Sequence, residues 1–134
     1  TVNQATGVAT DGGGGIDTLS GIENVIGTNA DDTITGNGAD NVFTGNDGSD
    51  RFILGEGGGN DTVLGGAGGG WTDTIQLTNT DASSVGAGWT VTLTTGSEVS
   101  DDGSTMTLTD DAAGTITLED GSQIAFEGIE NIQY

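Results

Sequence analysis

The sequence has no cysteine, histidine, lysine or proline, and its single basic residue is Arg51. Without cysteine, no disulfide can stabilise the chain, even outside the cell. Without histidine, cysteine or lysine, the usual groups for nucleophilic triads and for acid–base catalysis near pH 7 are missing. Paired carboxylates remain at 101–102 and 110–111, but we expect both pairs in solvated turns, with few aromatic residues to stack a sugar. We therefore expect that this chain is not an enzyme.

The charge is almost entirely of one sign. Twenty-one acidic residues face the one arginine, which gives a formal net charge of −20 at pH 7. Direct binding to nucleic acid or to an anionic membrane is not expected, because nothing would neutralise the phosphates. A transmembrane helix is not expected either, because no apolar run reaches the length of about 18 residues that a span needs. An evenly solubilised, halophilic surface would scatter the acids, whereas many of them cluster in glycine-rich turns.

Glycine is abundant, with 27 residues, and it recurs in a pattern. Residues 12–20 read Gly-Gly-Gly-Gly-Ile-Asp-Thr-Leu-Ser and fit the nonapeptide G-G-x-G-x-D-x-U-x, where U is a large apolar residue. Looser copies follow at 27–35, 36–44, 45–53, 57–64 and 68–75. Composition alone would favour a disordered linker. An apolar residue at the eighth position of every copy argues against disorder, because random low-complexity sequence would not place one there.

Each copy divides into a glycine-rich turn and a short strand, and glycine suits turns that need a positive φ or a close backbone approach. Two copies are expected to make one coil, so turns on the same side lie two repeats apart and about 4.8 Å from each other. Residues 21–26 stand where one repeat is missing, and we interpret them as a half-coil that keeps its strand but lacks the turn. The eighth-position side chains are expected in the interior: Leu19, Ile34, Phe43, Phe52, Val63 and Ile75.

The turns are rich in oxygen ligands. Backbone carbonyls and one side chain at the sixth position of each repeat would offer the roughly six to eight oxygens that Ca²⁺ prefers. About four or five calcium ions are expected between stacked turns, and the neutral Asn41 is expected to contribute less than its neighbours. The candidate calcium ligands are Gly12, Gly13, Gly15, Asp17, Gly27, Asn29, Asp32, Gly36, Gly38, Asn41, Gly45, Asp47, Asp50, Gly57, Gly59, Asp61, Gly68, Gly70 and Asp73.

This repeat resembles that of the RTX (repeats-in-toxin) proteins, whose nonapeptides form a calcium-binding parallel β structure. The resemblance implies an all-β fold, with a right-handed parallel β-roll over residues 1–77. An antiparallel β cap over residues 78–134 would then cover the last coil, because an open coil exposes an unpaired edge.

The second half changes to alternating strands, expected at 89–94, 106–109, 116–118 and 124–126. A two-residue turn at Asp102-Gly103 would place Val99 opposite Met106. Around Asp120-Gly121, a three-residue loop that pairs Leu118 with Ile124 is favoured over a two-residue loop, which would mix the two faces. Trp71, Trp89 and Tyr134 are expected to pack at the junction or in the core rather than to bind a ligand.

The segments 2–10 and 21–27 look like the RTX regions of giant bacterial adhesins, and the segment 115–130 resembles the C-termini of large biofilm and ice-binding adhesins exported by type I machinery. The resemblance implies a secreted or cell-surface, monomeric module that carries a C-terminal secretion signal and meets the type I secretion machinery during export. The alternatives are the RTX module of a secreted protease, lipase or alginate epimerase, and an ice-binding β-solenoid. An ice-binding array needs a repeated threonine, and Thr28 is followed by Asn37 and Asn46 at the matching positions.

Overall fold

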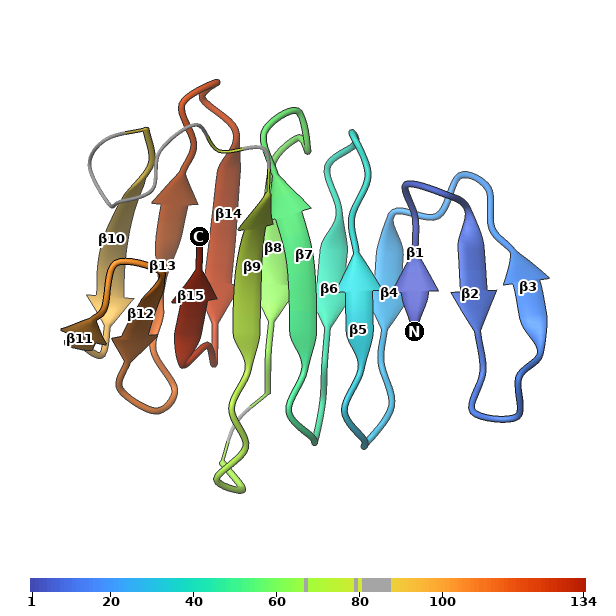
Figure 1. Ribbon diagram of the computed structural model, residues 1–134, viewed down its shortest axis with the longest axis horizontal. Helices are drawn as coiled ribbons and strands as arrows, with labels where there is room; N and C mark the ends of the chain where they lie inside the picture. Colours follow the sequence, from blue (N-terminus) through green and yellow to red (C-terminus); the bar gives the residue numbers. More distant parts are fainter. Residues whose placement is uncertain (67, 79, 81–87) are drawn as a thin grey trace.

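The computed structural model describes residues 1–66, 68–78, 80 and 88–134. Within this part the protein is all-β, contains no helix, and therefore has no helix that could cross a membrane (Figure 1). The strands are β1 (Val2–Asn3), β2 (Val8–Thr10), β3 (Ile16–Thr18), β4 (Asn24–Ile26), β5 (Thr33–Thr35), β6 (Val42–Thr44), β7 (Arg51–Gly55), β8 (Asp61–Leu64), β9 (Thr74–Thr78), β10 (Thr90–Thr95), β11 (Glu98–Asp101), β12 (Thr105–Leu108), β13 (Ala113–Thr117), β14 (Gln123–Glu127) and β15 (Asn131–Gln133).

The strands form two mixed sheets. One has nine strands in the order β11-β12-β15-β9-β7-β5-β1-β2-β3, and the other has six in the order β10-β13-β14-β8-β6-β4. From β4 to β9, successive strands alternate between the two sheets. Each of the strands β4 to β7 pairs in parallel with the strand two places further along the chain. The expected spacing of two repeats between neighbouring strands of a sheet is therefore confirmed.

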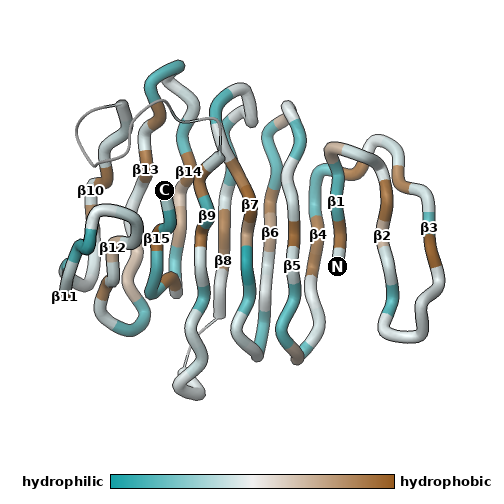
Figure 2. Tube along the Cα trace, in the orientation of Figure 1, coloured by the Kyte–Doolittle hydropathy of each residue, from teal (hydrophilic) through white to brown (hydrophobic). Residues whose placement is uncertain are grey.

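The core lies between the two sheets and is built from the eighth positions of the repeats. Ile34 is 1% exposed, and Phe43, Phe52, Val63 and Ile75 are completely buried, as expected. The rings of Phe43 and Phe52 lie 6.4 Å apart between centroids, so the two sheets contact each other directly. Figure 2 shows hydrophobic residues in the middle of these strands and hydrophilic ones in the turns that join them.

The first repeat departs from this arrangement, although it matches the sequence pattern best. Leu19 is only half-buried, and the whole of β3 is exposed, so the expected interior position of Leu19 is wrong. The reason is that β1 pairs in parallel with β5, with Val2 opposite Ile34. β1 thus occupies the place beside β5 that β3 would take if the strands alternated between the two sheets from the first repeat onward. β3 instead pairs antiparallel with β2 at the edge of the nine-stranded sheet.

The half-coil expected at 21–26 does form a strand, since β4 pairs in parallel with β6. Its central residue, Val25, is 8% exposed and belongs to the core. Strand formation here therefore does not depend on a preceding glycine-rich turn.

The C-terminal part is antiparallel only in its outer strands. β14 pairs in parallel with β8, and β15 pairs in parallel with β9, so both sheets continue from the repeats into the last residues of the chain. β13 and β10 then add antiparallel beside β14, and β12 and β11 beside β15. Phe126 and Ile132 are 4% and 0% exposed, and they extend the same core.

The expected strands of the second half are confirmed, but two of the expected registers are wrong. Met106 lies opposite Asp101 rather than Val99, because the turn is shifted by one residue and falls at Gly103-Ser104. The N–H of Asp102 donates to the Thr105 carbonyl (3.2 Å), and the Asp102 carboxylate in turn accepts the N–H of Thr105 (2.8 Å).

The other wrong register lies between β13 and β14. The loop has the expected three residues, but it spans 119–121, because the N–H of Leu118 donates to the Ser122 carbonyl (2.9 Å). Ile116 therefore lies opposite Ile124.

The three large aromatic residues near the junction differ in burial. Trp89 is 1% exposed, and its ring packs on Tyr134, with 4.9 Å between centroids. The Tyr134 hydroxyl donates to Asp101, and the Tyr134 N–H donates to the Ser104 carbonyl (3.0 Å), so the last residue is held to the β11–β12 hairpin. Packing is thus confirmed for Trp89 and Tyr134. Burial in the core is wrong for Trp71, which is 41% exposed and whose ring lies against Gly69 of the same turn.

Candidate functional site: two rows of stacked turns

The turns between the two sheets stack in two rows. The lower row, at the bottom of Figure 1, consists of residues 27–32, 45–50, 65–66 and 68–73, followed by 128–130 from the C-terminal part. The upper row consists of 36–41, 55–60 and 118–122. The strand that follows a turn pairs in parallel with the strand that follows the next turn of the same row. The registers of the sheets therefore fix how the turns stack.

Acidic side chains at the sixth repeat position link the lower turns to one another. The Asp32 N–H donates to Asp50 Oδ1 (2.8 Å), and the Asp50 N–H donates to Asp73 Oδ1 (2.8 Å). The Asp73 N–H donates to Glu130 Oε2 (2.7 Å), so a residue of the C-terminal part completes the series. Each carboxylate thereby accepts a backbone N–H from the preceding turn, which would otherwise lack a partner.

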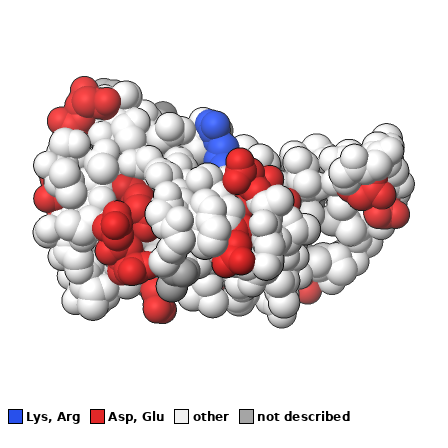
Figure 3. Space-filling view, turned by 90° about the horizontal axis from the view of Figure 1, so that it is seen from below, with Lys and Arg blue, Asp and Glu red and all other residues white. Residues whose placement is uncertain are grey.

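A second series runs in the opposite direction from the fifth repeat position. The Ser49 N–H donates to Asp31 Oδ1 (2.9 Å), and the Thr72 N–H donates to Ser49 Oγ (3.0 Å). Adjacent lower turns are therefore tied in both directions. Figure 3 views the molecule from below and shows several separate groups of acidic side chains, with Arg51 as the only basic one.

The upper turns are linked in the same way but with fewer charges. The Asn41 N–H donates to Asp61 Oδ1 (3.0 Å), the Asn60 N–H donates to Asp40 Oδ1 (2.8 Å), and the Gln123 N–H donates to Asn60 Oδ1 (3.1 Å). Asp120 closes this row by accepting the Gly57 N–H (2.7 Å). Amides thus stand at Asn41 and Asn60, whereas the first lower turn has Asp32 and Asp31 at the matching positions.

Three sixth-position carboxylates are buried: Asp50 is 1% exposed, and Asp61 and Asp73 are each 4% exposed. Burial disfavours the charged form and raises the pKa of Asp61 and of Asp73 to about 6, although the backbone N–H that each accepts lowers it in part. Burial also raises the pKa of Asp50, with smaller contributions from the nearby Asp32 and Asp31. A cation bound beside these carboxylates would offset the cost of burying their negative charge.

Asp50 is distinguished by an oxygen that lacks any hydrogen-bond partner. Its Oδ2 is buried and unpaired, whereas Oδ2 of Asp32 accepts both the N–H and the hydroxyl of Thr28 (2.7 and 2.9 Å). The residue of the Asp50 turn that corresponds to Thr28 is Asn46, which has a φ of 79° and donates its side-chain amide to the Gly27 carbonyl instead (3.0 Å). A buried carboxylate oxygen without a donor is costly unless a cation meets it.

The first glycine of each of the three repeat turns in the lower row faces a pair of oxygens. A Cβ on Gly27 would lie 2.8 Å from the Gly45 carbonyl oxygen and 2.9 Å from Asp32 Oδ2. A Cβ on Gly45 would meet Asp50 Oδ2 and the Gly65 carbonyl oxygen still more closely. We call such a place, between the carboxylate of one lower turn and the first-glycine carbonyl of the next, an oxygen cradle. Glycine is needed at its entrance because a side chain would fill it.

A third oxygen cradle joins the last repeat to the C-terminal part. A Cβ on Gly65 would meet the Gly128 carbonyl oxygen and Asp73 Oδ2. Carbonyl and carboxylate oxygens are the ligands that Ca²⁺ prefers, so the residues present fit a calcium ion. No cluster of three or more acidic side chains within the described residues could hold a metal ion. Backbone carbonyls must therefore supply much of any ligand shell.

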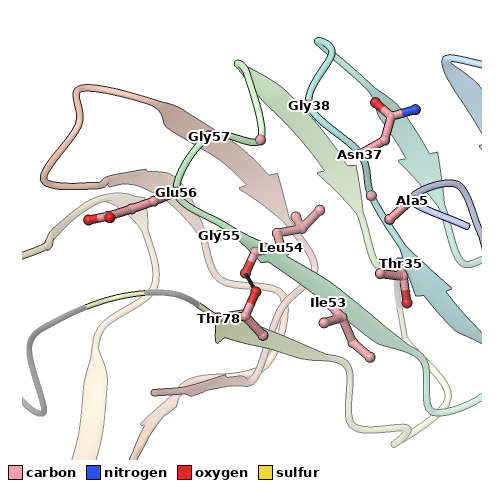
Figure 4. A pocket seen from close by; sticks show the side chains of 12 residues that line it. Ala5, Thr35, Asn37, Gly38, Ile53, Leu54, Gly55, Glu56, Gly57 and Thr78 are labelled. Carbon is pink, nitrogen blue, oxygen red and sulfur yellow. Dashed lines mark hydrogen bonds between the residues drawn. The ribbon is translucent and has the colours of Figure 1, made fainter.

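Two hollows open on the two rows. The lower one has a volume of about 190 Å³, and its lining includes the four acids Asp73, Asp110, Asp111 and Glu130. The upper one has about 360 Å³ and is lined mostly by glycine backbone, Thr35, Ile53, Leu54 and Thr78. Figure 4 shows this upper hollow, with the Glu56 side chain pointing away from the other labelled residues. Four acidic side chains thus line the lower hollow, whereas Glu56 is the one acid among the residues that line the upper hollow.

The predicted ligands separate into three groups. The first repeat lies apart, with Gly12, Gly13, Gly15 and Asp17 all exposed around the β2–β3 connection. The predicted lower-row residues come together: Gly27, Asn29, Asp32, Gly45, Asp47, Asp50, Gly68, Gly70 and Asp73. Those of the upper row are Gly36, Gly38, Asn41, Gly57, Gly59 and Asp61.

Sequence reasoning missed Gly65, Gly128 and Glu130, which complete the lower row. A signal for two of them is present, because Gly128-Ile129-Glu130-Asn131 repeats Gly21-Ile22-Glu23-Asn24. Both tetrapeptides lead into a strand of the parallel part of a sheet, β15 and β4. The second copy precedes β15, the strand that continues the parallel pairing of the nine-stranded sheet beside β9.

Comparison of the sequence with known protein families and with curated proteins gave no match.

Proposed function

We propose that this chain is a calcium-dependent folding module of the RTX β-roll type, which forms the C-terminal part of a large secreted bacterial adhesin exported by type I machinery. The observation that carries the proposal is the buried, unpartnered Oδ2 of Asp50 beside the Gly65 carbonyl. The alternation of strands between two sheets and the nonapeptide repeat support it. The adhesin and the secretion route rest on sequence resemblance alone.

Calcium would supply positive charge to a chain that carries −20 and has one basic residue. Calcium sites of extracellular modules have Kd values of about 10⁻⁴–10⁻³ M. A site that is filled at ten times its Kd stabilises the folded state by about 1.4 kcal/mol. Several such sites are comparable with the total stability of a domain, about 5–15 kcal/mol. The protein's own contribution is to hold carboxylates and carbonyls in register through its sheets.

The export proposal follows from the same linkage. Where calcium is scarce, as in the bacterial cytosol, the chain would stay unfolded and could pass through a narrow channel. Where calcium is millimolar, binding free energy becomes folding free energy and opposes return of the chain.

The test is circular dichroism of the purified chain in EDTA, in millimolar calcium and in millimolar magnesium. We expect β-sheet signal with calcium and its loss in EDTA, with magnesium much less effective because it demands a tighter octahedral shell. Equal spectra in EDTA and calcium would refute the proposal.

A further inference from the structure

We propose that this chain binds its calcium ions in the lower row only, in the three oxygen cradles, and that the last of these is completed by Gly128 of the C-terminal part. This rests on the calcium-dependent function proposed above. The repeat pattern by itself predicts sites in both rows, because sixth-position Asp or Asn occurs in both. The two rows nevertheless differ at the first glycines of their turns and at the sixth position of Asn41.

The lower row offers oxygens that no donor uses. Asp50 Oδ2 is buried in a side chain that is 1% exposed, has no partner, and lies next to the Gly45 and Gly65 backbone. This unpaired oxygen is independent of the acidic character of the row, and it points to a missing positive charge. Asp73 Oδ2 stands in the same relation to Gly65 and to the Gly128 carbonyl.

The upper row lacks these features around Asn41 and at the first glycines of its turns, although a Cβ on Gly58 would face Asp61 Oδ2 (3.5 Å) and the Gly55 carbonyl oxygen (2.7 Å). Asn41 is 1% exposed; its Oδ1 accepts the Asn37 N–H (3.3 Å), and the unpartnered atom is Nδ2, a donor that repels a cation. A Cβ on Gly36 would lie 2.7 Å from the Leu54 Cδ2 methyl group, where the lower row has a carbonyl oxygen. The Gly55 carbonyl accepts the Gly58 N–H of its own turn (3.0 Å).

The three lower cradles are not equal. Thr28 already donates twice to Asp32 Oδ2, so the first cradle should bind calcium most weakly. The third joins the last repeat to 128–130, where Glu130 already accepts the Asp73 N–H. An ion there would bind the C-terminal part to the repeats, so docking of that part becomes calcium-dependent.

The experiment counts bound calcium by isothermal titration calorimetry in the full chain and in two matched variants. Asp50→Asn removes a lower-row charge, and Asp61→Asn removes an upper-row charge of similar burial that also accepts one backbone N–H. We expect three ions in the native chain, two in Asp50→Asn, and three in Asp61→Asn. Loss of an ion from Asp61→Asn would overturn the one-sided assignment while leaving the calcium function intact. Absence of calcium binding in the native chain would overturn both.

Two further variants keep the test valid if Asp50→Asn does not fold. Gly27→Ala should fill the first cradle and lose one ion, whereas its control in the upper row, Gly38→Ala, meets only the Gly57 carbonyl at 3.2 Å and should lose none. Asn41→Asp restores the sequence pattern in the upper row, yet it should gain no ion because the Leu54 side chain blocks the place. A fourth ion in Asn41→Asp, or no loss in Gly27→Ala, would contradict the proposal.

Discussion

The lower and upper rows of turns share one core and the same sheets but differ in their chemistry. In the lower row, an unbroken series of carboxylates runs through Asp32, Asp50, Asp73 and Glu130. The backbone N–H of each of the first three residues donates to the carboxylate of the next. In the upper row, an amide stands at Asn41 and the glycine-lined hollow contains Leu54. The difference teaches that the backbone arrangement needs only a short polar acceptor at the sixth position. A charge at that position is therefore not required for the backbone arrangement.

The largest effect is expected from breaking the core that both rows share. Phe52→Ala lies in β7, which follows a lower turn, and Phe43→Ala lies in β6, which follows an upper turn. Both rings are completely buried, so each truncation should lower the free energy of unfolding by about 3–5 kcal/mol. Urea denaturation at a fixed calcium concentration measures this, with Thr44→Ala as a control on the half-buried outer side of β6. A large loss for one ring and none for the other would mean that the rows fold independently.

The next effect in size is the pH dependence, which should separate the rows when calcium is added. In the metal-free chain the folded pKa of Asp61 and of Asp73 is about 6, above the unfolded value of 3.8. The folded state then holds protons that the unfolded state has released, so stability falls as pH rises from about 4 to about 6 and is flat above that range. The loss is on the order of 3 kcal/mol for each group.

Under the one-sided binding proposed above, calcium should reverse this for the lower row only, because a metal ligand must be deprotonated. NMR titration of the two carboxyl carbons should show the pKa of Asp73 falling on calcium addition while that of Asp61 stays near 6. A fall of both pKa values by the same amount would contradict the difference between the rows.

The smallest expected effect concerns the C-terminal ends of the two rows. Glu130→Gln keeps an acceptor for the Asp73 N–H but loses a charge, and it should cost about 1 kcal/mol of unfolding free energy and weaken calcium binding. Asp120→Asn alters the matching residue of the upper row, which accepts the Gly57 N–H, and should leave calcium binding unchanged. Thermal unfolding with and without calcium provides both values. Equal calcium responses of the two variants would argue that the rows are equivalent.

How much could be predicted from sequence varies along the chain. The eighth-position residues Ile34 to Ile75 were predicted correctly, because a buried apolar side chain in every repeat is a local signal that the fold only has to align. The first repeat was predicted wrongly despite its perfect match. Its place depends on competition: β1 pairs with β5 and displaces β3, and no feature of residues 12–20 reveals that.

The candidate site shows the same limit. Carboxylates in glycine turns could be found from the sequence, and Asp32, Asp50 and Asp73 do lie in one row. Gly65, Gly128 and Glu130 were missed, because the pattern ends before 128–130 and only folding brings these residues to the last lower turn. The free Oδ2 of Asp50 could not be predicted either, since it depends on the positive φ of Asn46.

The sequence by itself therefore determined the periodic core, the spacing of same-side turns, and the supply of oxygen ligands, because each depends on residues within one or two repeats. The tertiary structure alone decided which strands are neighbours at the two ends and which carboxylate keeps an unpaired oxygen. It also decided that the C-terminal residues complete the lower row. These outcomes depend on hydrogen-bond competition between segments far apart in the chain, and such competition is settled only when all the strands are in place.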